Sequence, residues 1–164
     1  TWSDQAAEYA STLVKKCVFE HDSVAERGNM GQNLFVSGGN QPLNAESAVD
    51  YWDDEKHDYD YESNTCASGK MCGHYTQVVT AYSNKVGCAA HYCSAISNLP
   101  EFTNGGVIIA CNYDPAGNMV GVRPYPKGNG TSLNSNDTTT KDLNEDDGKR
   151  THNLPCGKER GLRG

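Results

Sequence analysis

The sequence predicts an α+β fold in which helices pack on an antiparallel sheet. Two segments with helical periodicity come first, and two runs rich in Val, Ile, Cys and Tyr follow at residues 86–93 and 106–113. Helices followed by a run of strands are typical of this class, and strands that are neighbours along the chain pair antiparallel through short connections.

The first predicted helix begins at Ser3, a residue type that commonly caps helices. Apolar residues then recur at helical spacing as far as Val14, and Cys17 lies in the connection that follows. A short apolar segment at residues 32–36 comes next and is bounded by turn residues at 37–40. This part of the chain therefore predicts an amphipathic helix with one face on a core.

The second predicted helix starts at Ala45, after an Asn44 cap, and runs to about His57. Glu55 falls on the same apolar face as Trp52, three residues earlier. A carboxylate on that face must be paired, hydrogen-bonded, metal-bound or protonated, because burying it alone is costly. The alternative is that Glu55 lies at the edge of the face and reaches water.

The two later runs predict an antiparallel pair of strands, joined by a loop that contains Pro and Asn. A third strand is predicted from Asn118 to Arg123, after a turn at residues 114–117. The three strands would form a meander on which the two helices pack.

Residues 1–126 are predicted to form one compact domain, and residues 127–164 a disordered or hinge-like tail without periodicity. The compact part holds seven Lys and Arg against fifteen Asp and Glu, a net charge of −8, and the tail carries +1. This balance argues against nucleic acid or an anionic membrane as the partner. No apolar run approaches the length of a membrane span.

Seven cysteines in 164 residues indicate an oxidising compartment, and their spacing is unlike that of a zinc site. Six of them lie in the compact part, and Cys156 lies in the tail. Asn129 and Asn136 begin sequons for N-glycosylation. The sequence therefore predicts a secreted, extracellular glycoprotein.

Two motifs resemble the signatures of the CAP superfamily, which comprises cysteine-rich secretory proteins, antigen 5 and pathogenesis-related proteins. They are Cys-Gly-His-Tyr-Thr-Gln-Val-Val at residues 72–79 and Cys-Asn-Tyr-Asp-Pro-Ala-Gly-Asn at 111–118, followed by Arg-Pro-Tyr at 123–125. The resemblance extends from Trp2 to Tyr125. It implies an α-β-α sandwich with a central antiparallel sheet and three disulfides, here without the first family helix.

The resemblance also implies how the cysteines pair, which the sequence alone leaves open among fifteen pairings. The implied disulfides are Cys17 with Cys93, Cys66 with Cys72, and Cys88 with Cys111.

Members of the family have a cavity lined by two histidines and two carboxylates, and the matching residues here are His21, Gln32, Glu55 and His74. Gln32 stands where the family usually has glutamate, so the site lacks one negative charge and one base. Neutral imidazoles of His21 and His74 are suited to Zn²⁺, which we expect to bind weakly. Taken alone, each histidine is also compatible with a hydrogen-bonded structural role.

The resemblance implies a secreted binding or effector module that carries a sterol or other small lipid, holds a divalent cation or recognises an extracellular protein, in defence, venom or reproduction. An alternative is a metal-dependent, protease-like hydrolase that uses His21, Glu55 and His74. We expect binding rather than catalysis, because the known hydrolase motifs are missing. A third hypothesis gives the four residues a structural role.

Overall fold

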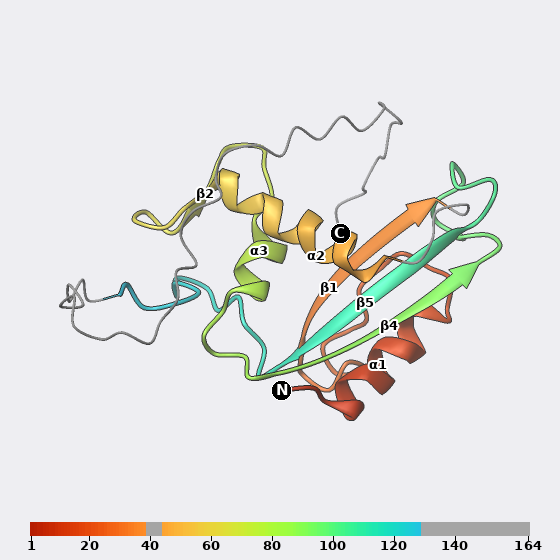
Figure 1. Ribbon diagram of the computed structural model, residues 1–164, viewed down its shortest axis with the longest axis horizontal. Helices are drawn as coiled ribbons and strands as arrows, with labels where there is room; N and C mark the ends of the chain where they lie inside the picture. The colour runs from red at the N-terminus through yellow and green to blue at the C-terminus, as the bar shows by residue number, and fades with distance from the viewer. Residues whose placement is uncertain (39–43, 129–164) are drawn as a thin grey trace, which may run out of the picture. The chain divides into compact units, whose positions relative to one another are not determined.

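The computed structural model describes residues 1–38 and 44–128 of the chain. Its main sheet has the strand order β1 (Gly31–Gly38), β5 (Gly106–Asp114) and β4 (Lys85–Cys93), and both pairs are antiparallel (Figure 1). Every residue of the central strand β5 except the last is buried. The antiparallel pair predicted from the two later apolar runs is confirmed.

Helix α1 (Asp4–Val14) begins where the sequence predicts it. The Ser3 side chain caps it by accepting a hydrogen bond from the Ala6 amide at 3.2 Å. The apolar side of α1 packs on one face of the sheet. Its buried cluster comprises Ala10, Leu13, Val14, Phe19, Leu34, Val36, Cys93, Ile96, Ile108 and Ala110.

Helix α2 (Ala45–Asp54) covers the other face, and the Asn44 side chain caps it as predicted. Trp52 is fully buried there and donates from its indole nitrogen to the Leu34 carbonyl at 3.0 Å. The predicted end of this helix, at about His57, is one turn too late. The α-helix ends at Asp54, and the chain then tightens into a 3₁₀ helix, η1 (Glu55–Asp58). Such tightening is common at the ends of α-helices.

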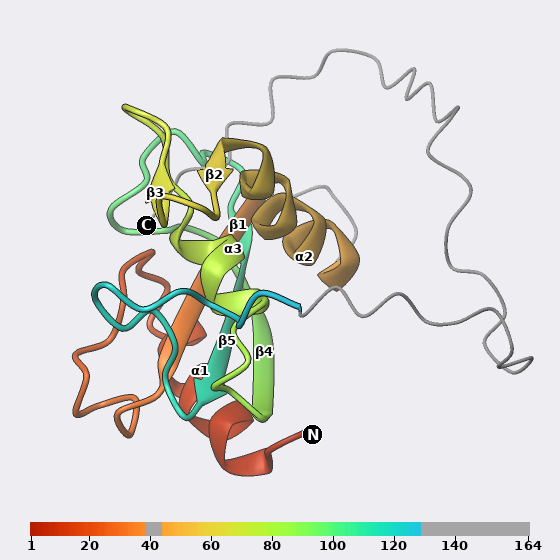
Figure 2. The ribbon, with the colours of Figure 1, turned by 90° about the vertical axis from the view of Figure 1, so that its left-hand side faces the viewer.

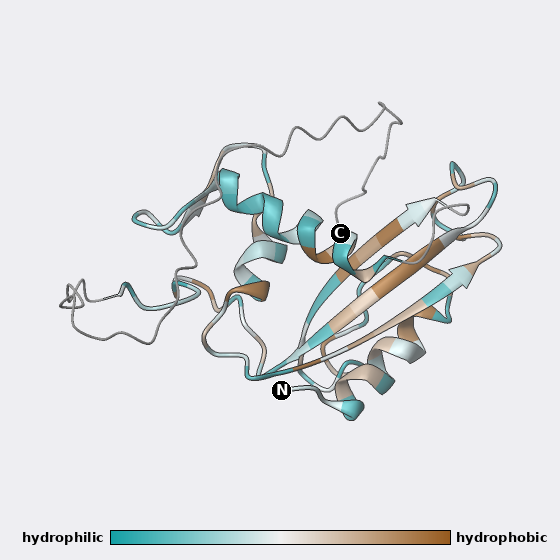
Figure 3. Cartoon of the chain, viewed as in Figure 1, coloured by the Kyte–Doolittle hydropathy of each residue, from teal (hydrophilic) through white to brown (hydrophobic). Residues whose placement is uncertain are grey.

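Three short elements lie beside α2. The strands β2 (Tyr59–Asp60) and β3 (Thr65–Cys66) form a hairpin next to the end of α2, and α3 (Gly73–Val78) lies nearby (Figure 2). Hydrophobic residues concentrate in the middle of β1 and β5, whereas α2 presents many hydrophilic ones (Figure 3). The helices on both faces of an antiparallel sheet confirm the α+β fold.

Alternation along β1 assigns its side chains to two faces. Leu34 and Val36 belong to the cluster under α1, whereas Phe35 packs against the cluster under α2. Gln32 therefore shares the α1 side, and Asn33 shares the α2 side. This division decides which of the predicted site residues can meet.

The predicted third strand at Asn118–Arg123 is wrong, and β1 supplies the third strand instead. Asn118 and Gly121 have φ values of +56° and +77°, which an extended strand excludes. The amide nitrogen of Asn118 donates to the Gly73 carbonyl at 2.9 Å, and its oxygen accepts from the Thr76 hydroxyl at 2.7 Å. These bonds hold the segment against α3 rather than in the sheet.

Three disulfides join the elements, with the pairing that the resemblance implies. They are Cys17–Cys93, Cys66–Cys72 and Cys88–Cys111, with sequence separations of 76, 6 and 23 residues.

Several sequence predictions concern residues that the structure does not describe. Asn129, Asn136, Cys156 and the predicted tail from residue 129 all lie outside the described ranges. Within residues 1–38 and 44–128, no helix has the length and hydrophobicity needed to cross a membrane.

Gly87 lets α1 approach β4 closely. A Cβ at this position would clash with backbone atoms of Ser3 and Ala7, which cannot move without shifting the helix. We expect Gly87→Ala to lower the free energy of unfolding by about 3 kcal/mol, measured by urea denaturation. Gly38→Ala is the matched control, because a Cβ there meets no atom within 4 Å. Equal stability of the two variants would contradict the close approach.

Burial raises the pKa of Tyr113 to about 12, against 10.0 for a free side chain. The folded protein therefore keeps the phenol proton more firmly than the unfolded chain. Stability from this group is complete below pH 10 and is lost as the pH rises toward 12. Urea denaturation at a series of pH values measures the free energy of unfolding. We expect this energy to fall less between pH 10 and 12 in Tyr113→Phe than in the wild type, whereas Tyr82→Phe, at an exposed position, should behave like the wild type.

Candidate functional site

Glu55 and His74 form a buried pair, with exposed fractions of 6% and 3%. One carboxylate oxygen lies 2.8 Å from Nδ1 of His74, and the other accepts the backbone amides of His74 and Tyr75 at 3.0 and 3.2 Å. Glu55 arrives there at the end of α2, and His74 at the start of α3. Of the two alternatives for Glu55, the structure shows the buried, hydrogen-bonded one.

The other ring nitrogen of His74 has no partner. An ionised Glu55 only accepts hydrogen bonds, so His74 donates from Nδ1, and Nε2 offers a lone pair when the ring is neutral. In the described part of the chain, this Nε2 is the one buried side-chain nitrogen or oxygen without a hydrogen bond. Leaving such an atom unpaired costs about 1–3 kcal/mol, so Nε2 fits a cation or a bound water. Trp52 stacks beside the ring at 6.4 Å between centroids.

His21 and Gln32 form the second pair. Gln32 Oε1 lies 2.9 Å from Nδ1 of His21 and accepts the Asp22 amide at 3.3 Å, and Gln32 Nε2 donates to the Asn112 side chain at 2.9 Å. Asn112 in turn donates to the Ala6 carbonyl in α1 at 3.1 Å. Because Oε1 accepts, His21 donates from Nδ1, and its Nε2 offers a lone pair when the ring is neutral. His21 itself is exposed.

The loop that carries His21 is held by charged side chains. Lys16 forms an ion pair with the buried Asp22 at 2.6 Å, next to His21. Arg27 donates to the backbone carbonyls of Asp22 and Met30, at 2.5 and 2.8 Å. These contacts fix the position of His21 relative to Gln32.

Hydrogen bonds join the four predicted residues in two pairs, His21 with Gln32 and Glu55 with His74. Among the described residues, the metal-ligating atoms of His21, Glu55 and His74 do not gather within 4.8 Å of one another. The bonds of Gln32 lead toward α1, whereas the Asn33 amide donates to the His74 carbonyl at 3.1 Å on the α2 side. Consecutive residues of β1 thus connect the two pairs.

A cavity of about 270 Å³ lies between α3, the β2–β3 hairpin and residues 118–124. Met119, Val122 and Tyr82 line it and are 45%, 39% and 46% exposed, and the rest of the wall is largely polar, with Asn64, Thr76, Thr80 and Asn118. Arg123 is the one lining residue with a charged side chain, and its Nε donates to the Tyr61 carbonyl at 2.9 Å. The sequence did not point to this cavity, because its wall comes from a segment predicted as a strand.

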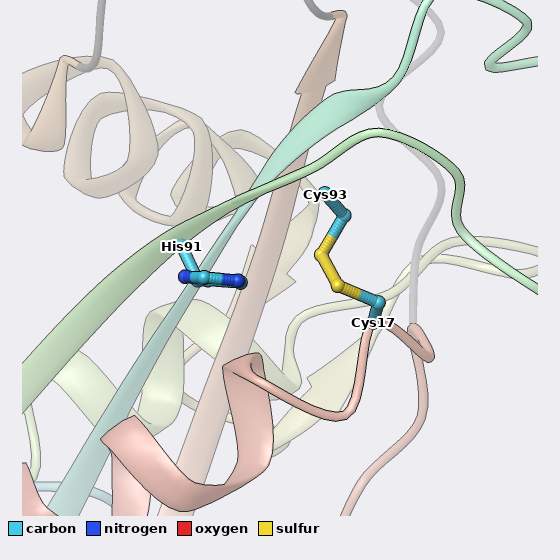
Figure 4. Close-up of side chains that lie close together, drawn as sticks. All are labelled: Cys17, His91 and Cys93. Carbon is cyan, nitrogen blue, oxygen red and sulfur yellow. A yellow bond between two sulfur atoms is a disulfide. The ribbon is translucent and has the colours of Figure 1, made fainter.

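The structure also brings together Cys17, His91 and Cys93, whose ligand atoms lie within 4.8 Å of one another. Figure 4 shows the His91 ring beside the Cys17–Cys93 disulfide. The family resemblance had paired Cys17 with Cys93, but sequence reasoning missed that His91 lies beside them. The alternation of β4, which puts residues 91 and 93 on one face, was the available signal.

The sequence profile of the CAP family, the cysteine-rich secretory protein family, matches residues 1–113. The chain belongs to this family. Pathogenesis-related protein 1A of Nicotiana tabacum is 44% identical over 125 residues, which are 76% of this chain and 68% of that protein. Peptidase inhibitor 16 of Homo sapiens is 39% identical over 130 residues, or 77% of this chain and 26% of that protein.

Solved structures of CAP proteins have the same fold. The crystal structure of NaASP2 with Zn²⁺ is similar with a TM-score of 0.60 and 28% identity, covering 78% of this chain and 66% of that one. Venom allergen-like protein 4 of Schistosoma mansoni has a TM-score of 0.58 at 23% identity, over 77% and 72% of the two chains, and shows the fold alone. The family resemblance seen in the sequence is therefore confirmed.

Gln32 matches the hydrogen bonds of Asn112 in a way that glutamate cannot. A carboxylate at position 32 would face the acceptor oxygen of Asn112, whose amide group is held by the Ala6 carbonyl. We expect Gln32→Glu to lower the free energy of unfolding at pH 7 by about 1–3 kcal/mol, measured by urea denaturation. Gln5→Glu, exposed on α1, is the control and should change little. An unchanged stability of Gln32→Glu would show that Asn112 reorients freely.

Proposed function

We propose that this CAP protein is a secreted binding module that takes a sterol or another small lipid in the cavity beside α3. The observation that carries the proposal is that three exposed apolar or aromatic side chains, Met119, Val122 and Tyr82, line that cavity. Small-molecule sites usually enclose about 300–1,000 Å³, so a cavity of about 270 Å³ would hold part of a lipid and leave the rest on the rim.

The charge of the cavity supports a neutral, amphipathic ligand. The guanidinium of Arg123 is already engaged by the Tyr61 carbonyl and lies 5.5 Å from the centre of the Tyr61 ring. The hydroxyl of Thr76 and the amide of Asn118 bond to each other. Part of the polar wall is thus satisfied within the protein, and the exposed side chains of Met119, Val122 and Tyr82 offer apolar contact to a ligand.

Extracellular action agrees with the three disulfides, which persist in oxidising compartments. An extracellular protein would be the second class of partner, recognised at the surface. The acidic charge of residues 1–126 continues to disfavour nucleic acid.

Titration of the intact protein with a fluorescent sterol tests the lipid proposal. We expect saturable binding, at least tenfold weaker in Met119→Glu, because a charge on the rim must be desolvated. Val120→Glu is the matched control, since Val120 is fully exposed, at 101%, and does not line the cavity. Absence of saturable binding, or equal loss in both variants, would refute the proposal.

A second proposal is a weak cation site at His74, with His21 as the other ligand. The unpaired Nε2 of His74 favours it, and Glu55 orients the ring as carboxylates do behind metal-bound histidines. NaASP2 has been crystallised with Zn²⁺. Zn²⁺ held there would supply a Lewis acid. Calorimetry with Zn²⁺ should give heat that His74→Ala abolishes and His57→Ala retains; no heat in the wild type would favour the structural role.

The hydrolase alternative gains no support from the geometry. Glu55 would have to act as a general base, but its two oxygens already accept three hydrogen bonds from His74 and Tyr75. The carboxylate is therefore committed to holding α3.

A further inference from the structure

We propose that the turn at residues 119–122 docks the protein on the surface of a zwitterionic lipid bilayer. Met119 and Val122 are 45% and 39% exposed, and Val120 between them is 101% exposed. Single exposed apolar side chains are common on proteins, but these three gather in one turn. The inference rests on the proposed function, because it names a bilayer as the source of the lipid that the cavity takes.

The backbone of this turn projects Val120 away from the protein. The Val122 amide donates to the Met119 carbonyl at 3.0 Å, so Val120 and Gly121 occupy the two central positions. Gly121 has a φ of +77°, and a Cβ there would meet no atom within 4 Å. A protein partner would need a matching pocket for a side chain that protrudes in this way, whereas the acyl chains of a bilayer adapt to it.

Hydrogen bonds hold both ends of the turn. The Asn118 amide donates to the Gly73 carbonyl in α3, which the segment passes (Figure 2), and Arg123 donates to the carbonyls of Tyr61 and Glu62. A turn fixed in this way presents its apolar side chains without first being ordered.

The turn also forms part of the cavity wall. Met119 and Val122 line the cavity and are exposed to solvent, so they lie where it opens. Tyr82 lies at the same opening and is 46% exposed, and the amphipathic ring of tyrosine suits the boundary between water and lipid. A bilayer in contact with the turn therefore faces the opening through which a lipid enters.

The distribution of charge selects the kind of bilayer. Residues 1–126 carry a net charge of −8, which opposes anionic lipid, but residues 63–100 and 115–126 hold no Asp or Glu. Apart from Tyr59, every residue that lines the cavity belongs to one of these two stretches. On the hairpin side, Asp58 is paired with Lys70 at 3.2 Å. A zwitterionic surface thus meets little repulsion here, and buried apolar area supplies the affinity.

Flotation of the intact protein with phosphatidylcholine vesicles tests the docking alone. The wild type is compared with Val120→Glu and with Val49→Glu, the matched control, since Val49 is 46% exposed on α2 and does not line the cavity. Circular dichroism checks that both variants fold. In a second measurement, Val120→Trp and Val49→Trp are mixed with vesicles whose acyl chains carry bromine, which quenches indole fluorescence on contact.

We expect the wild type and Val49→Glu to float with the vesicles. Val120→Glu should bind at least tenfold more weakly, because its carboxylate must be desolvated at the bilayer surface. Brominated chains should quench Val120→Trp more than Val49→Trp. No flotation of the wild type, equal binding of Val120→Glu, or equal quenching of the two tryptophan variants overturns the proposal. A dimer in solution that Val120→Glu dissociates also overturns it, because the turn would then bind a second copy of the chain.

Sterol transfer separates this proposal from the proposed function. Val120→Glu should bind a fluorescent sterol in solution as the wild type does, but should extract it from vesicles at least tenfold more slowly. If the wild type floats with vesicles and binds no sterol, the docking stands and the lipid role of the cavity fails. If it binds sterol and does not float, the docking alone fails.

Discussion

Replacing Glu55 with alanine should lower the free energy of unfolding by about 4 kcal/mol. The substitution leaves three donors without this acceptor: the buried backbone amide and ring Nδ1 of His74, and the part-buried amide of Tyr75. Equilibrium unfolding in urea, followed by the fluorescence of Trp52 and Trp2, measures the change. The start of α3 should become the least stable part of the protein.

Asp54→Ala is the matched control for this prediction. Asp54 precedes Glu55 but is 81% exposed, and its contact with His57 is 3.7 Å long. Its removal should change stability by no more than about 0.5 kcal/mol. If Glu55→Ala also costs less than about 1 kcal/mol, water replaces the carboxylate and the pair does not hold α3 in place.

Removing a disulfide should destabilise the protein more when the loop that it closes is longer. Double replacement by serine should cost about 4 kcal/mol for Cys17–Cys93, about 3 for Cys88–Cys111 and about 2 for Cys66–Cys72, because a longer loop restricts the unfolded chain more. The sequence separations behind this order are 76, 23 and 6 residues. Thermal and urea denaturation of the three double variants provide the measurement.

The order of the three losses decides the outcome, since the absolute values depend on strain in the folded protein. Loss of Cys66–Cys72 has a second effect, because this loop leads into α3 and His74. If its removal costs more than removal of Cys17–Cys93, the disulfide acts mainly by positioning α3. The cation affinity of His74 would then fall as well.

Local signals in the sequence were sufficient to predict where the helices α1 and α2 begin. Ser3 and Asn44 cap α1 and α2 as predicted. Each offers a side-chain acceptor directly before a segment whose apolar residues recur at helical spacing, and this combination favours the start of a helix. The paired strands β4 and β5 were also predictable from their runs rich in Val, Ile, Cys and Tyr. The third strand was not, because the segment at 31–38 and that at 118–123 have similar local patterns and only tertiary contacts distinguish them.

Around the four predicted residues, some contacts could be predicted from the sequence and others could not. The burial of Glu55 followed from its helical face, and the pairing of His74 with it required only a neighbouring donor. That Gln32 faces α1 depends on the register of β1 against β5, which pairs Gln32 with Asn112. The cluster of His91 with Cys17 and Cys93 depends on a contact between α1 and β4 across the whole chain.

Residues 118–125 close the cavity without belonging to any helix or strand. Arg123 holds them to the Tyr61 carbonyl, and the Tyr61 hydroxyl donates to the Tyr125 carbonyl at 2.9 Å. Hydrogen bonds of this kind are worth about 1 kcal/mol each, so the wall can open far more often than the sheet unfolds. The rate at which a ligand enters and leaves should therefore follow the strength of these bonds and of those from Asn118 to α3, rather than the stability of the protein.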